Sequence, residues 1–330
     1  MFKDEKTFDS EKSVKYVFRK SFKETDALVI VFSAFQKIGS PPSYNYVRTI
    51  EEFDCNKLFI LDDFGARASY YLCENRDFSI ERSVIKLIRK IIEENDIKTV
   101  ISAGSSKGGY AAMYYGIKYG FDYIISASPQ YLLGDYLLKQ TRTNEVVKFM
   151  AGNDLEGDHI FLNTIMKNMI IKTHNKPNIL IHLGKGEMHY QKHVLPLTKD
   201  LDDAGLQYNL DLGDYDKHSD VAKAFPPILK GKIREYIGYP SLDIEIQRNN
   251  VDGSCKFIAK TETDNKVAWY VYQNNKKIDA KNYSLDKFYD LKTTNHGEYK
   301  VKAFAQNEKG LKVSLFSEPI IIQMEQTIQS

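Results

Sequence analysis

The stretch TVISAGSSKGGYAAMYYGIKYG, residues 99–120, changes character twice within a few positions. It begins with β-branched residues typical of a buried strand, passes through glycines and serines, and ends with apolar residues at helical spacing. Between strand and helix, residues 104–108 fit the pattern G-x-S-x-G, in which glycines two positions before and after the serine permit a very tight turn. The stretch therefore predicts a β-strand, a sharp turn centred on Ser106 and a helix.

Such a turn makes Ser106 a candidate nucleophile. Its hydroxyl is expected to lie exposed at the carboxyl end of the strand. The amide of Lys107 is expected to point into an oxyanion site at the helix N-terminus, where the helix dipole favours negative charge. A turn rich in glycine and serine can also bind a phosphate group. The sequence, however, lacks the G-x-x-x-x-G-K-[ST] order of a P-loop and the G-x-G-x-x-G of a dinucleotide site.

The composition is that of an ordinary globular protein. The 330 residues are 42% hydrophobic and 27% charged with a net charge of +2, which indicates one large or two smaller domains and argues against a nucleic-acid-binding protein. No apolar run reaches the length of a transmembrane segment, and the polar N-terminal stretch has no signal-peptide pattern, so we expect a cytoplasmic protein. Cys55, Cys73 and Cys255 have no metal-binding spacing and are expected to be reduced.

Strand and helix patterns alternate over residues 1–240. Apolar runs predict strands at 27–32, 57–61, 100–103, 123–127, 178–183 and 208–212, with an early edge strand at 16–19, and amphipathic patterns predict helices at 80–95 and 220–236. This alternation predicts an α/β domain with a mainly parallel sheet and helices on both faces. Residues 129–177 are helical and polar in pattern, and we expect them to form an insertion that acts as a lid or a substrate wall.

The pattern changes after residue 240. Short alternating segments at 243–247, 254–258, 267–272, 297–304 and 319–323 predict strands of a small β-sandwich over residues 241–330. Trp269, the only tryptophan, lies within one of these segments and is expected to anchor the core of the sandwich.

A nucleophilic serine needs a base, and the base needs an acid that orients it. In this fold the three residues follow the chain order serine, acid, histidine. His218 comes directly after the last predicted strand and is the candidate base. Glu187 follows the preceding strand and is the candidate acid, with Asp214 and Asp216 as alternatives close to the histidine.

Two further groups of residues concern the surroundings of this triad. His189 and His193 lie close to Glu187, but the spacing lacks the adjacent glutamate of a zincin and shows no third ligand, so we expect no metal. The amide of Ala34 or Phe35, in the loop after an early strand, is expected to be the second oxyanion donor beside Lys107.

The loop after the strand at 57–61 faces the same edge of the sheet. There Arg67 and Asp63 are candidate substrate-binding residues, and Arg67 suits an anionic or hydroxyl-rich substrate. Arg67 can equally pair with Asp62 or Asp63 to hold the loop.

Five segments, VFSAF, LFILDDFGARASYYL, SAGSSKGGYAAMYYG, IHLGKGE and DKHSD, together resemble a known group of proteins. They resemble the α/β-hydrolase-type proteins of bacterial capsular polysaccharide biosynthesis and the hydrolase domain of the accessory Sec component that O-acetylates sugars on serine-rich adhesins. The resemblance covers about residues 26–239. It implies that Ser106, Glu187 and His218 form the triad and that the substrate is a carbohydrate-linked acyl group. The C-terminal part resembles the triple-tyrosine or immunoglobulin-like modules appended to such proteins.

Three functions are compatible with these patterns. The first is a cofactor-independent serine esterase or O-acetyltransferase acting on an acylated carbohydrate or glycan precursor. The second is a non-catalytic scaffold of a glycan biosynthesis or secretion complex, with the β-sandwich docking a protein partner. The third is a peptidase or lipase of the same fold. A lipase would tend to expose an apolar lid, whereas the many charged residues of the 129–177 segment favour a polar substrate.

Overall fold

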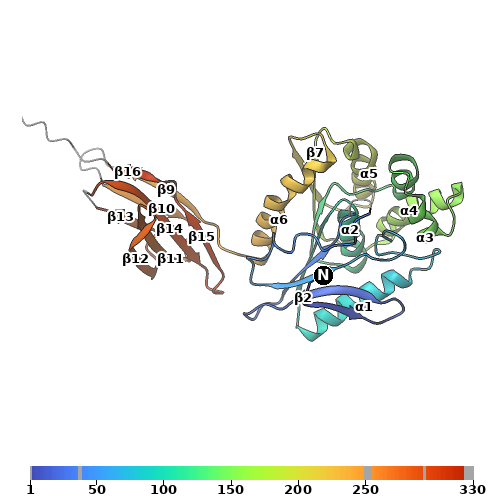
Figure 1. Cartoon of the computed structure of the whole chain (residues 1–330), viewed down its shortest axis with the longest axis horizontal. Helices are drawn as coiled ribbons and strands as arrows, with labels where there is room; N and C mark the ends of the chain where they lie inside the picture. The colour runs from blue at the N-terminus through green and yellow to red at the C-terminus, as the bar shows by residue number, and fades with distance from the viewer. Residues whose placement is uncertain (1, 36–38, 249–253, 293–294, 323–330) are drawn as a thin grey trace, which may run out of the picture. The chain divides into compact units, whose positions relative to one another are not determined.

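The computed structural model describes residues 2–35, 39–248, 254–292 and 295–322 of the chain. These residues form two compact units, Met1–Tyr236 and Ile237–Ser330 (Figure 1). Each unit has its own hydrophobic core, as set out below.

The first unit is built on a sheet in the order β1-β2-β4-β3-β5-β6-β7-β8. From β4 to β8 all neighbours are parallel, whereas β1 and β2 join antiparallel at one side. The strands are β1 Glu5–Phe8, β2 Val14–Arg19, β3 Ala27–Phe32, β4 Asn56–Ile60, β5 Thr99–Ser105, β6 Tyr123–Ala127, β7 Asn178–Gly184 and β8 Tyr208–Gly213. The predicted mainly parallel sheet is confirmed.

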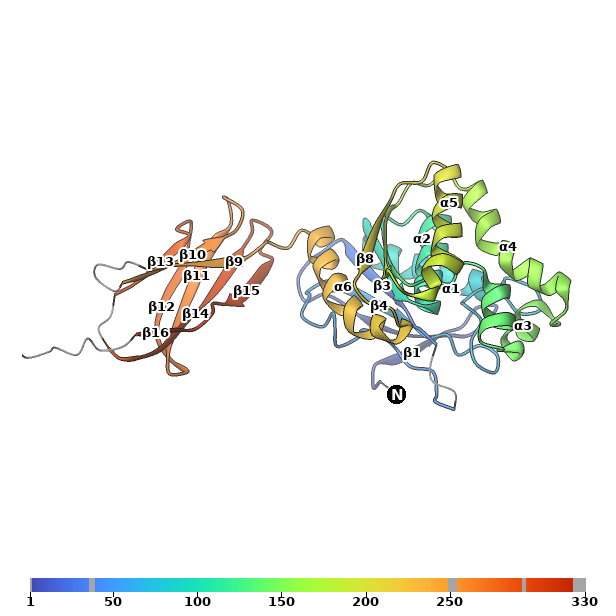
Figure 2. The ribbon, with the colours of Figure 1, turned by 90° about the horizontal axis from the view of Figure 1, so that it is seen from above.

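Helices cover both faces of this sheet, as predicted (Figure 2). The helices α1 Ser79–Glu94, α2 Lys107–Tyr119, α4 Glu156–Lys172 and α5 Leu195–Asp203 share one core with alternate residues of the strands, such as Ile181 of β7. The next residue, His182, points to the opposite face and stacks on Phe225 of α6 Val221–Ile237. Side chains alternate along a strand, so α6 covers the second face.

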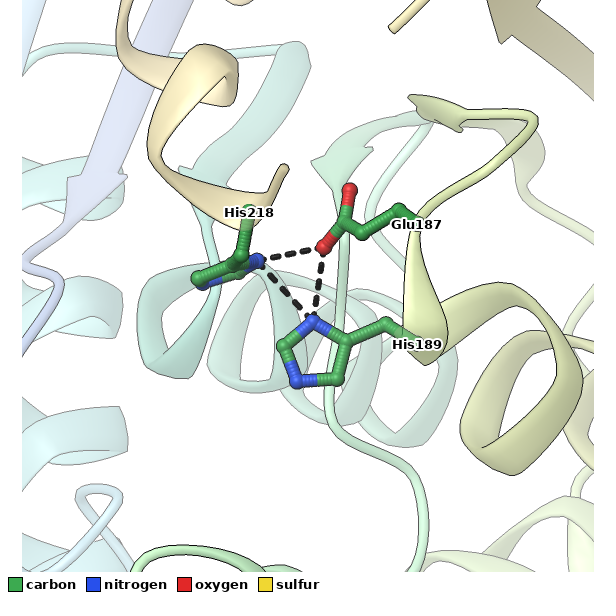
Figure 3. Close-up of side chains that lie close together, drawn as sticks. All are labelled: Glu187, His189 and His218. Carbon is green, nitrogen blue, oxygen red and sulfur yellow. Dashed lines mark hydrogen bonds and ion pairs between the residues drawn. The ribbon is translucent and has the colours of Figure 1, made fainter. Parts of the chain in front are cut away.

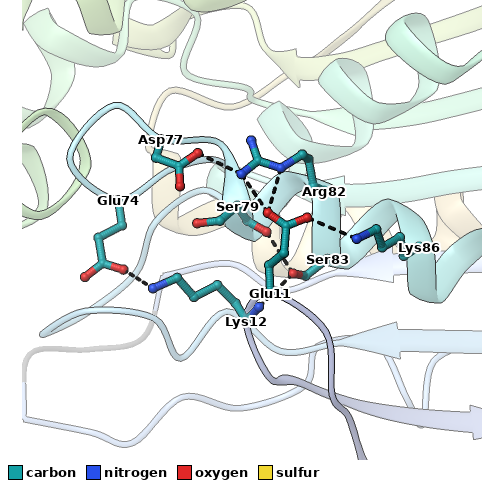
Figure 4. A network of polar contacts seen from close by, with 8 residues as sticks. All are labelled: Glu11, Lys12, Glu74, Asp77, Ser79, Arg82, Ser83 and Lys86. Carbon is teal, nitrogen blue, oxygen red and sulfur yellow. Dashed lines mark hydrogen bonds and ion pairs between the residues drawn. The ribbon is translucent and has the colours of Figure 1, made fainter.

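The early strand is not at the edge. β2 pairs on both sides, and β1, which was not predicted, is the edge strand. The turn between β1 and β2 is held to α1 by a polar network (Figure 4). Glu11 accepts hydrogen bonds from Arg82 and Lys86 at 2.8 and 3.0 Å, and the Lys12 amide donates to Ser83 Oγ at 2.9 Å. These contacts add to the burial of Val14 and Val17 in holding the antiparallel hairpin to α1.

The 129–177 segment is helical, as predicted. It contains a π-helix, η1 Asp135–Gln140, followed by α3 Asn144–Ala151 and α4. α4 packs against α2 and α5, while η1 reaches the carboxyl ends of the strands, where Tyr136 approaches the site described below. The segment is therefore partly a structural layer and partly a wall of the site.

The second unit consists of two antiparallel sheets around a common core. One has the order β13-β10-β9, and the other has the order β12-β11-β14-β15, with β16 also paired to β14. Trp269 is fully buried in the core between them, as expected. The strands are β9 Asp243–Arg248, β10 Cys255–Lys260, β11 Lys266–Gln273, β12 Lys276–Ser284, β13 Phe288–Leu291, β14 Gly297–Gln306, β15 Lys312–Phe316 and β16 Ile320–Ile322. β12, β13 and β15 were not predicted, and Gln323 of the predicted last strand lies outside the described residues.

Two further sequence expectations concern single features. Cys55, Cys73 and Cys255 are all buried, and none forms a disulfide within the described residues. Within the described ranges, no helix combines the length and apolar character needed to cross a membrane.

Candidate active site

Ser106 lies between β5 and α2 in a backbone conformation that few residues other than glycine adopt. Its φ is 56° and its ψ is −120°, and its side chain lies next to the N-terminus of α2. A positive φ at a serine is strained by about 1–3 kcal/mol and persists only where the surrounding structure enforces it. Here the Ser106 amide donates to Ala127 O at 2.8 Å, and α2 begins at the next residue.

The glycines of the G-x-S-x-G pattern are needed for this turn. A Cβ on Gly104 would lie 2.3 Å from the carbonyl oxygen of Gly108, and a Cβ on Gly108 would lie 2.2 Å from the carbonyl oxygen of Phe32. Both distances are far below van der Waals contact, so only glycine lets β5, α2 and β3 approach this closely. The close packing holds Ser106 at the carboxyl edge of the sheet.

His218 and Glu187 complete a chain of hydrogen bonds from Ser106. His218, in the short helix η3 His218–Asp220 after β8, places Nε2 at 3.0 Å from Ser106 Oγ. Its Nδ1 lies 2.5 Å from Oε1 of Glu187, which follows β7. If Nδ1–H donates to the carboxylate, Nε2 is left to accept the serine proton, as the tautomer of a general base requires.

A second histidine binds the same carboxylate (Figure 3). His189 Nδ1 lies 2.7 Å from Glu187 Oε1 and 2.9 Å from His218 Nδ1. When both Nδ1 atoms donate to Oε1, the contact between the two nitrogens is a consequence of sharing one acceptor. Ser128 Oγ donates to Oε2 at 2.8 Å, so Glu187 has three donors.

The hydrogen-bond donors around Glu187 determine its charge. Burial raises the pKa of Glu187, but the hydrogen bonds from His189 and His218 outweigh it, so that the pKa falls to about 2. Burial lowers the pKa of His189, only partly offset by its bond to Glu187. Near neutral pH the site therefore holds a carboxylate and a neutral His189.

Sequence reasoning did not identify two residues that lie close to the nucleophile. Gln130, fully buried, donates from Nε2 to Ser106 Oγ at 2.5 Å, and Gln130 Oε1 has no hydrogen-bond partner. The hydroxyl of Tyr136 also interacts with Ser106, and the Tyr136 ring lies 5.5 Å from that of His189. Both belong to the segment interpreted as a lid. The position of Ser128 and Gln130 directly after β6 was the available signal.

The backbone amides predicted to bind the oxyanion differ in the hydrogen bonds that they make. The Lys107 amide is the first of α2, where no intrahelical acceptor exists. The Ala34 amide donates to Asn45 Oδ1 at 2.8 Å, so it is engaged within its own loop. Phe35 lies beside the same site, with its ring 5.0 Å from the guanidinium carbon of Arg67.

The charged residues after β4 form ion pairs with other elements. Asp62 pairs with the buried Nζ of Lys107 at 2.8 Å, which ties this loop to the first residue of α2. Asp63 pairs with Lys15 of β2 at 2.6 Å. This ion pair gives a structural role to Asp63, which was predicted to bind substrate. Arg67 lines a cavity with Ala34 and Lys107.

Neither alternative to Glu187 is hydrogen-bonded to His218. Asp214 is exposed and pairs with Lys185 at 2.8 Å. Asp216 lies against Gly186, where a Cβ would meet its carboxylate. Among the residues that the structure describes, Glu187 is the carboxylate that bonds His218.

The ligand atoms of Glu187, His189 and His218 lie within 4.8 Å of one another, a spacing that could bind a metal ion. Ligands of tetrahedral zinc, however, lie about 3.3 Å apart, given metal–ligand distances of about 2 Å. The separations of 2.5–2.9 Å here are those of hydrogen bonds. The arrangement therefore suits an acid bound by two histidines better than a metal site.

His193 packs beside this cluster, with its ring 5.2 Å from that of His189, and its ring nitrogens bond other residues. Its Nδ1 accepts from the Leu132 amide at 3.2 Å, and its Nε2 lies 3.0 Å from the side-chain amide of Gln140. Burial lowers the pKa of His193 to about 3, so the ring is neutral. These contacts give His193 a structural role in holding η1.

Comparison with known proteins finds similarity in structure only. No protein-family profile and no curated protein matches the sequence. The capsule O-acetyltransferase of Neisseria meningitidis serogroup A, in complex with caged gadolinium, matches with a TM-score of 0.60 and 24% identity over 69% of this chain and 93% of that chain. A mutant of that enzyme in complex with CoA matches with a TM-score of 0.58 and 22% identity, over 69% and 94% of the two chains.

Two other solved structures share the architecture. The glycosylation-associated Gap123 complex of Streptococcus agalactiae matches with a TM-score of 0.58 and 14% identity over 70% of this chain and 46% of that chain. The fluorophosphonate-binding serine hydrolase FphF of Staphylococcus aureus gives a TM-score of 0.52 and 15% identity over 71% and 97%. Together with the sheet topology, these similarities show that the chain has the α/β-hydrolase fold.

Proposed function

We propose that this protein is a serine-dependent acyl-transfer enzyme, an esterase or O-acetyltransferase acting on an acylated carbohydrate or glycan precursor. The observation that supports it most directly is the strained Ser106 at the strand–helix turn, with His218 Nε2 at 3.0 Å and Glu187 behind the imidazole. A strained, nearly buried serine bonded to an oriented histidine has no evident structural purpose, whereas it is what nucleophilic catalysis requires.

In the proposed reaction Ser106 Oγ attacks the acyl carbon while its proton passes to His218 Nε2. Glu187 stabilises the resulting imidazolium and holds the ring in place. The tetrahedral intermediate collapses as His218 returns the proton to the leaving group, which leaves an acyl-serine. Water or a sugar hydroxyl then gives up a proton to His218 and attacks the acyl carbon. The second intermediate collapses as His218 passes that proton to Ser106 Oγ, which leaves and restores the enzyme.

The oxyanion of the intermediate needs hydrogen-bond donors. The Lys107 amide at the start of α2 is one. Gln130 Nε2 is the proposed second, because it already lies 2.5 Å from Ser106 Oγ, to which the acyl carbon becomes bonded. This assignment takes the place of the Ala34 amide, which is engaged with Asn45, while Phe35 stays a predicted donor.

The structural neighbours support the substrate class. One is a capsule O-acetyltransferase, also solved with CoA, and another belongs to a glycosylation-associated complex. A carbohydrate acceptor and an acyl-CoA donor are therefore the first substrates to test. The proposal also keeps the cytoplasmic location and the docking of a protein partner on the C-terminal unit, which cell fractionation and pull-downs with residues 241–330 would test.

The test is intact mass spectrometry after treatment with a fluorophosphonate. We expect one adduct on the wild type, none on Ser106→Ala, and slow labelling of His218→Ala. Ser105→Ala is the matched control, because the Ser105 hydroxyl bonds Tyr46 rather than the histidine, and it should label normally. EDTA should leave the labelling unchanged.

Two results would contradict the proposal. If the folded wild type forms no adduct, the serine is not activated and the scaffold function becomes the better explanation. If EDTA abolishes turnover of acetate esters and zinc restores it, the Glu187, His189 and His218 cluster acts as a metal site.

A further inference from the structure

A cavity of about 340 Å³ opens beside the turn that holds Ser106. One wall contains Ala34, Lys107 at the start of α2, and Arg67 from the loop after β4. The other wall comes from residues 141–145, between η1 and α3, and includes Arg142. Two arginines from separate loops thus line one cavity together with Lys107, the residue that follows Ser106.

Arg142 is held there at a cost in backbone strain. Its φ is 52°, a value that is unfavourable for a residue with a side chain. Its neighbours fix this conformation, since the Thr141 amide donates to Tyr136 O at 2.9 Å and the Thr143 amide donates to Leu137 O at 2.7 Å. Strain that the surroundings enforce is concentrated at functional sites, and here it places an arginine at the cavity.

The charge balance of the cavity is positive. Asp62 reaches the cavity but is neutralised by Lys107 and also accepts from the Ser69 amide. Glu145 is the remaining acidic lining residue. In the described part of the chain no carboxylate lies within ion-pair distance of Arg142.

We propose that this cavity binds a phosphate or carboxylate group of the substrate, held by Arg67 and Arg142. Guanidinium groups match the two oxygens of such anions with paired hydrogen bonds. The inference rests on the proposed function and narrows its substrate class to one that carries negative charge. The anion comes either from the acyl donor, as in an acyl-CoA, or from the glycan, as in a phosphorylated or uronic sugar.

Binding is measured by isothermal titration calorimetry on the full chain with Ser106→Ala, so that no probe is turned over. The probes are CoA, glucose 6-phosphate, galacturonate and, as the neutral reference, glucose. Each of the substitutions Arg67→Gln and Arg142→Gln is expected to raise the Kd of the bound anionic probe by about tenfold or more. Arg89→Gln, an exposed arginine on α1, is the matched control and should change nothing.

The variants with lysine separate charge from geometry. Arg67→Lys and Arg142→Lys keep the charge and are expected to recover only part of the affinity, because an ammonium group lacks the paired donors. They also replace the glutamine variants if thermal unfolding shows that either of those is not folded.

Each outcome bears on the inference. Arginine-dependent binding of CoA alone assigns the cavity to the donor, and binding of an anionic sugar alone assigns it to the glycan. If no anionic probe binds, or if binding is equal in the arginine variants, the inference is overturned. Fluorophosphonate labelling of the chain with Ser106 intact is independent of these results, so failure there removes the proposed reaction while leaving the anion site standing.

Discussion

At the scale of single residues, the position of the Gln130 side chain is the observation that most needs a functional explanation. It is fully buried, donates to the nucleophile and leaves its own carbonyl oxygen unpartnered. A buried amide oxygen without a partner costs about 1–3 kcal/mol, which is tolerated where a substrate supplies the missing donor. A hydroxyl group of the acceptor would fit this role.

We predict that Gln130→Ala lowers kcat for an acetate ester by about 10²-fold, as loss of one oxyanion donor does, with little change in KM. Gln140→Ala is the matched control, because Gln140 is a half-buried glutamine that contacts His193 instead of Ser106. Steady-state kinetics with p-nitrophenyl acetate would measure both. An unchanged kcat in Gln130→Ala would remove Gln130 from the oxyanion site.

Glu187 gives a prediction about pH and stability. Its pKa in the folded protein is about 2, below the ordinary value of 4.5, so the unfolded chain binds more protons than the folded one between these values. The stabilisation is therefore fully present above about pH 4.5 and is lost as the pH falls towards 2.

We expect the free energy of unfolding of the wild type to fall through this window more steeply than that of Glu187→Gln. Urea unfolding at several pH values between 5.5 and 3 would measure it. Glu11→Gln serves as the comparison, because the pKa of Glu11 is also lowered to about 2, by Arg82 and Lys86 on the surface. High salt should reduce the pH dependence of the free energy of unfolding that Glu11 contributes and leave the contribution of Glu187 unchanged. Parallel curves for wild type and Glu187→Gln would contradict this account.

The residues of the candidate site differ in how far the sequence predicted them. Ser106 is marked by local turn chemistry, and Glu187 and His218 follow from the order of strands along the chain. Gln130 and Tyr136 reach the serine only through the tertiary packing of residues 129–177. The sequence pattern of that segment predicts helices and a polar surface but not which side chains contact Ser106. His189 was noticed as a ligand of a metal rather than as a partner of the acid, because spacing does not distinguish the two.

At the scale of elements, the turn between β5 and α2 is the feature on which the site depends. Gly108→Ala would place a methyl group 2.2 Å from the carbonyl oxygen of Phe32, so β3 and α2 must move apart. We expect the free energy of unfolding to fall by about 1–3 kcal/mol or more and the fluorophosphonate labelling to be lost.

Gly231→Ala is the matched control for this substitution. Gly231 lies within α6 with open space around it, so alanine should stabilise the helix by about 0.5–1 kcal/mol. Chemical denaturation of both variants would test the pair. A Gly108→Ala protein with wild-type stability and labelling would show that the turn tolerates a side chain.

Burial explains which elements the sequence predicted. β3, β4 and β5 are buried on both faces, so their apolar runs are clear in the sequence. β12 and β15 are largely exposed, and β1 is a short edge strand, so none has an apolar face that the core requires. Their pairing is set by neighbouring strands through backbone hydrogen bonds, which leave little trace in the sequence.

At the scale of the whole molecule, the two units have separate cores. The core of the first unit lies between its sheet and helices, and that of the second lies around Trp269 between its two sheets. Every residue of the candidate site belongs to the first unit, Met1–Tyr236. We therefore expect the site to fold without the C-terminal strands.

This separation predicts that Trp269→Ala unfolds the second unit at lower denaturant without affecting the chemistry of Ser106. Loss of a fully buried tryptophan removes about 3–5 kcal/mol from the unit that contains it. Calorimetry should show one transition shifted to lower temperature and one unchanged, while fluorophosphonate labelling proceeds at the wild-type rate. A chain ending at residue 240 should label equally well. If either change slowed the labelling of Ser106, the two units would be coupled, and the C-terminal unit would take part in forming the site rather than in docking a partner.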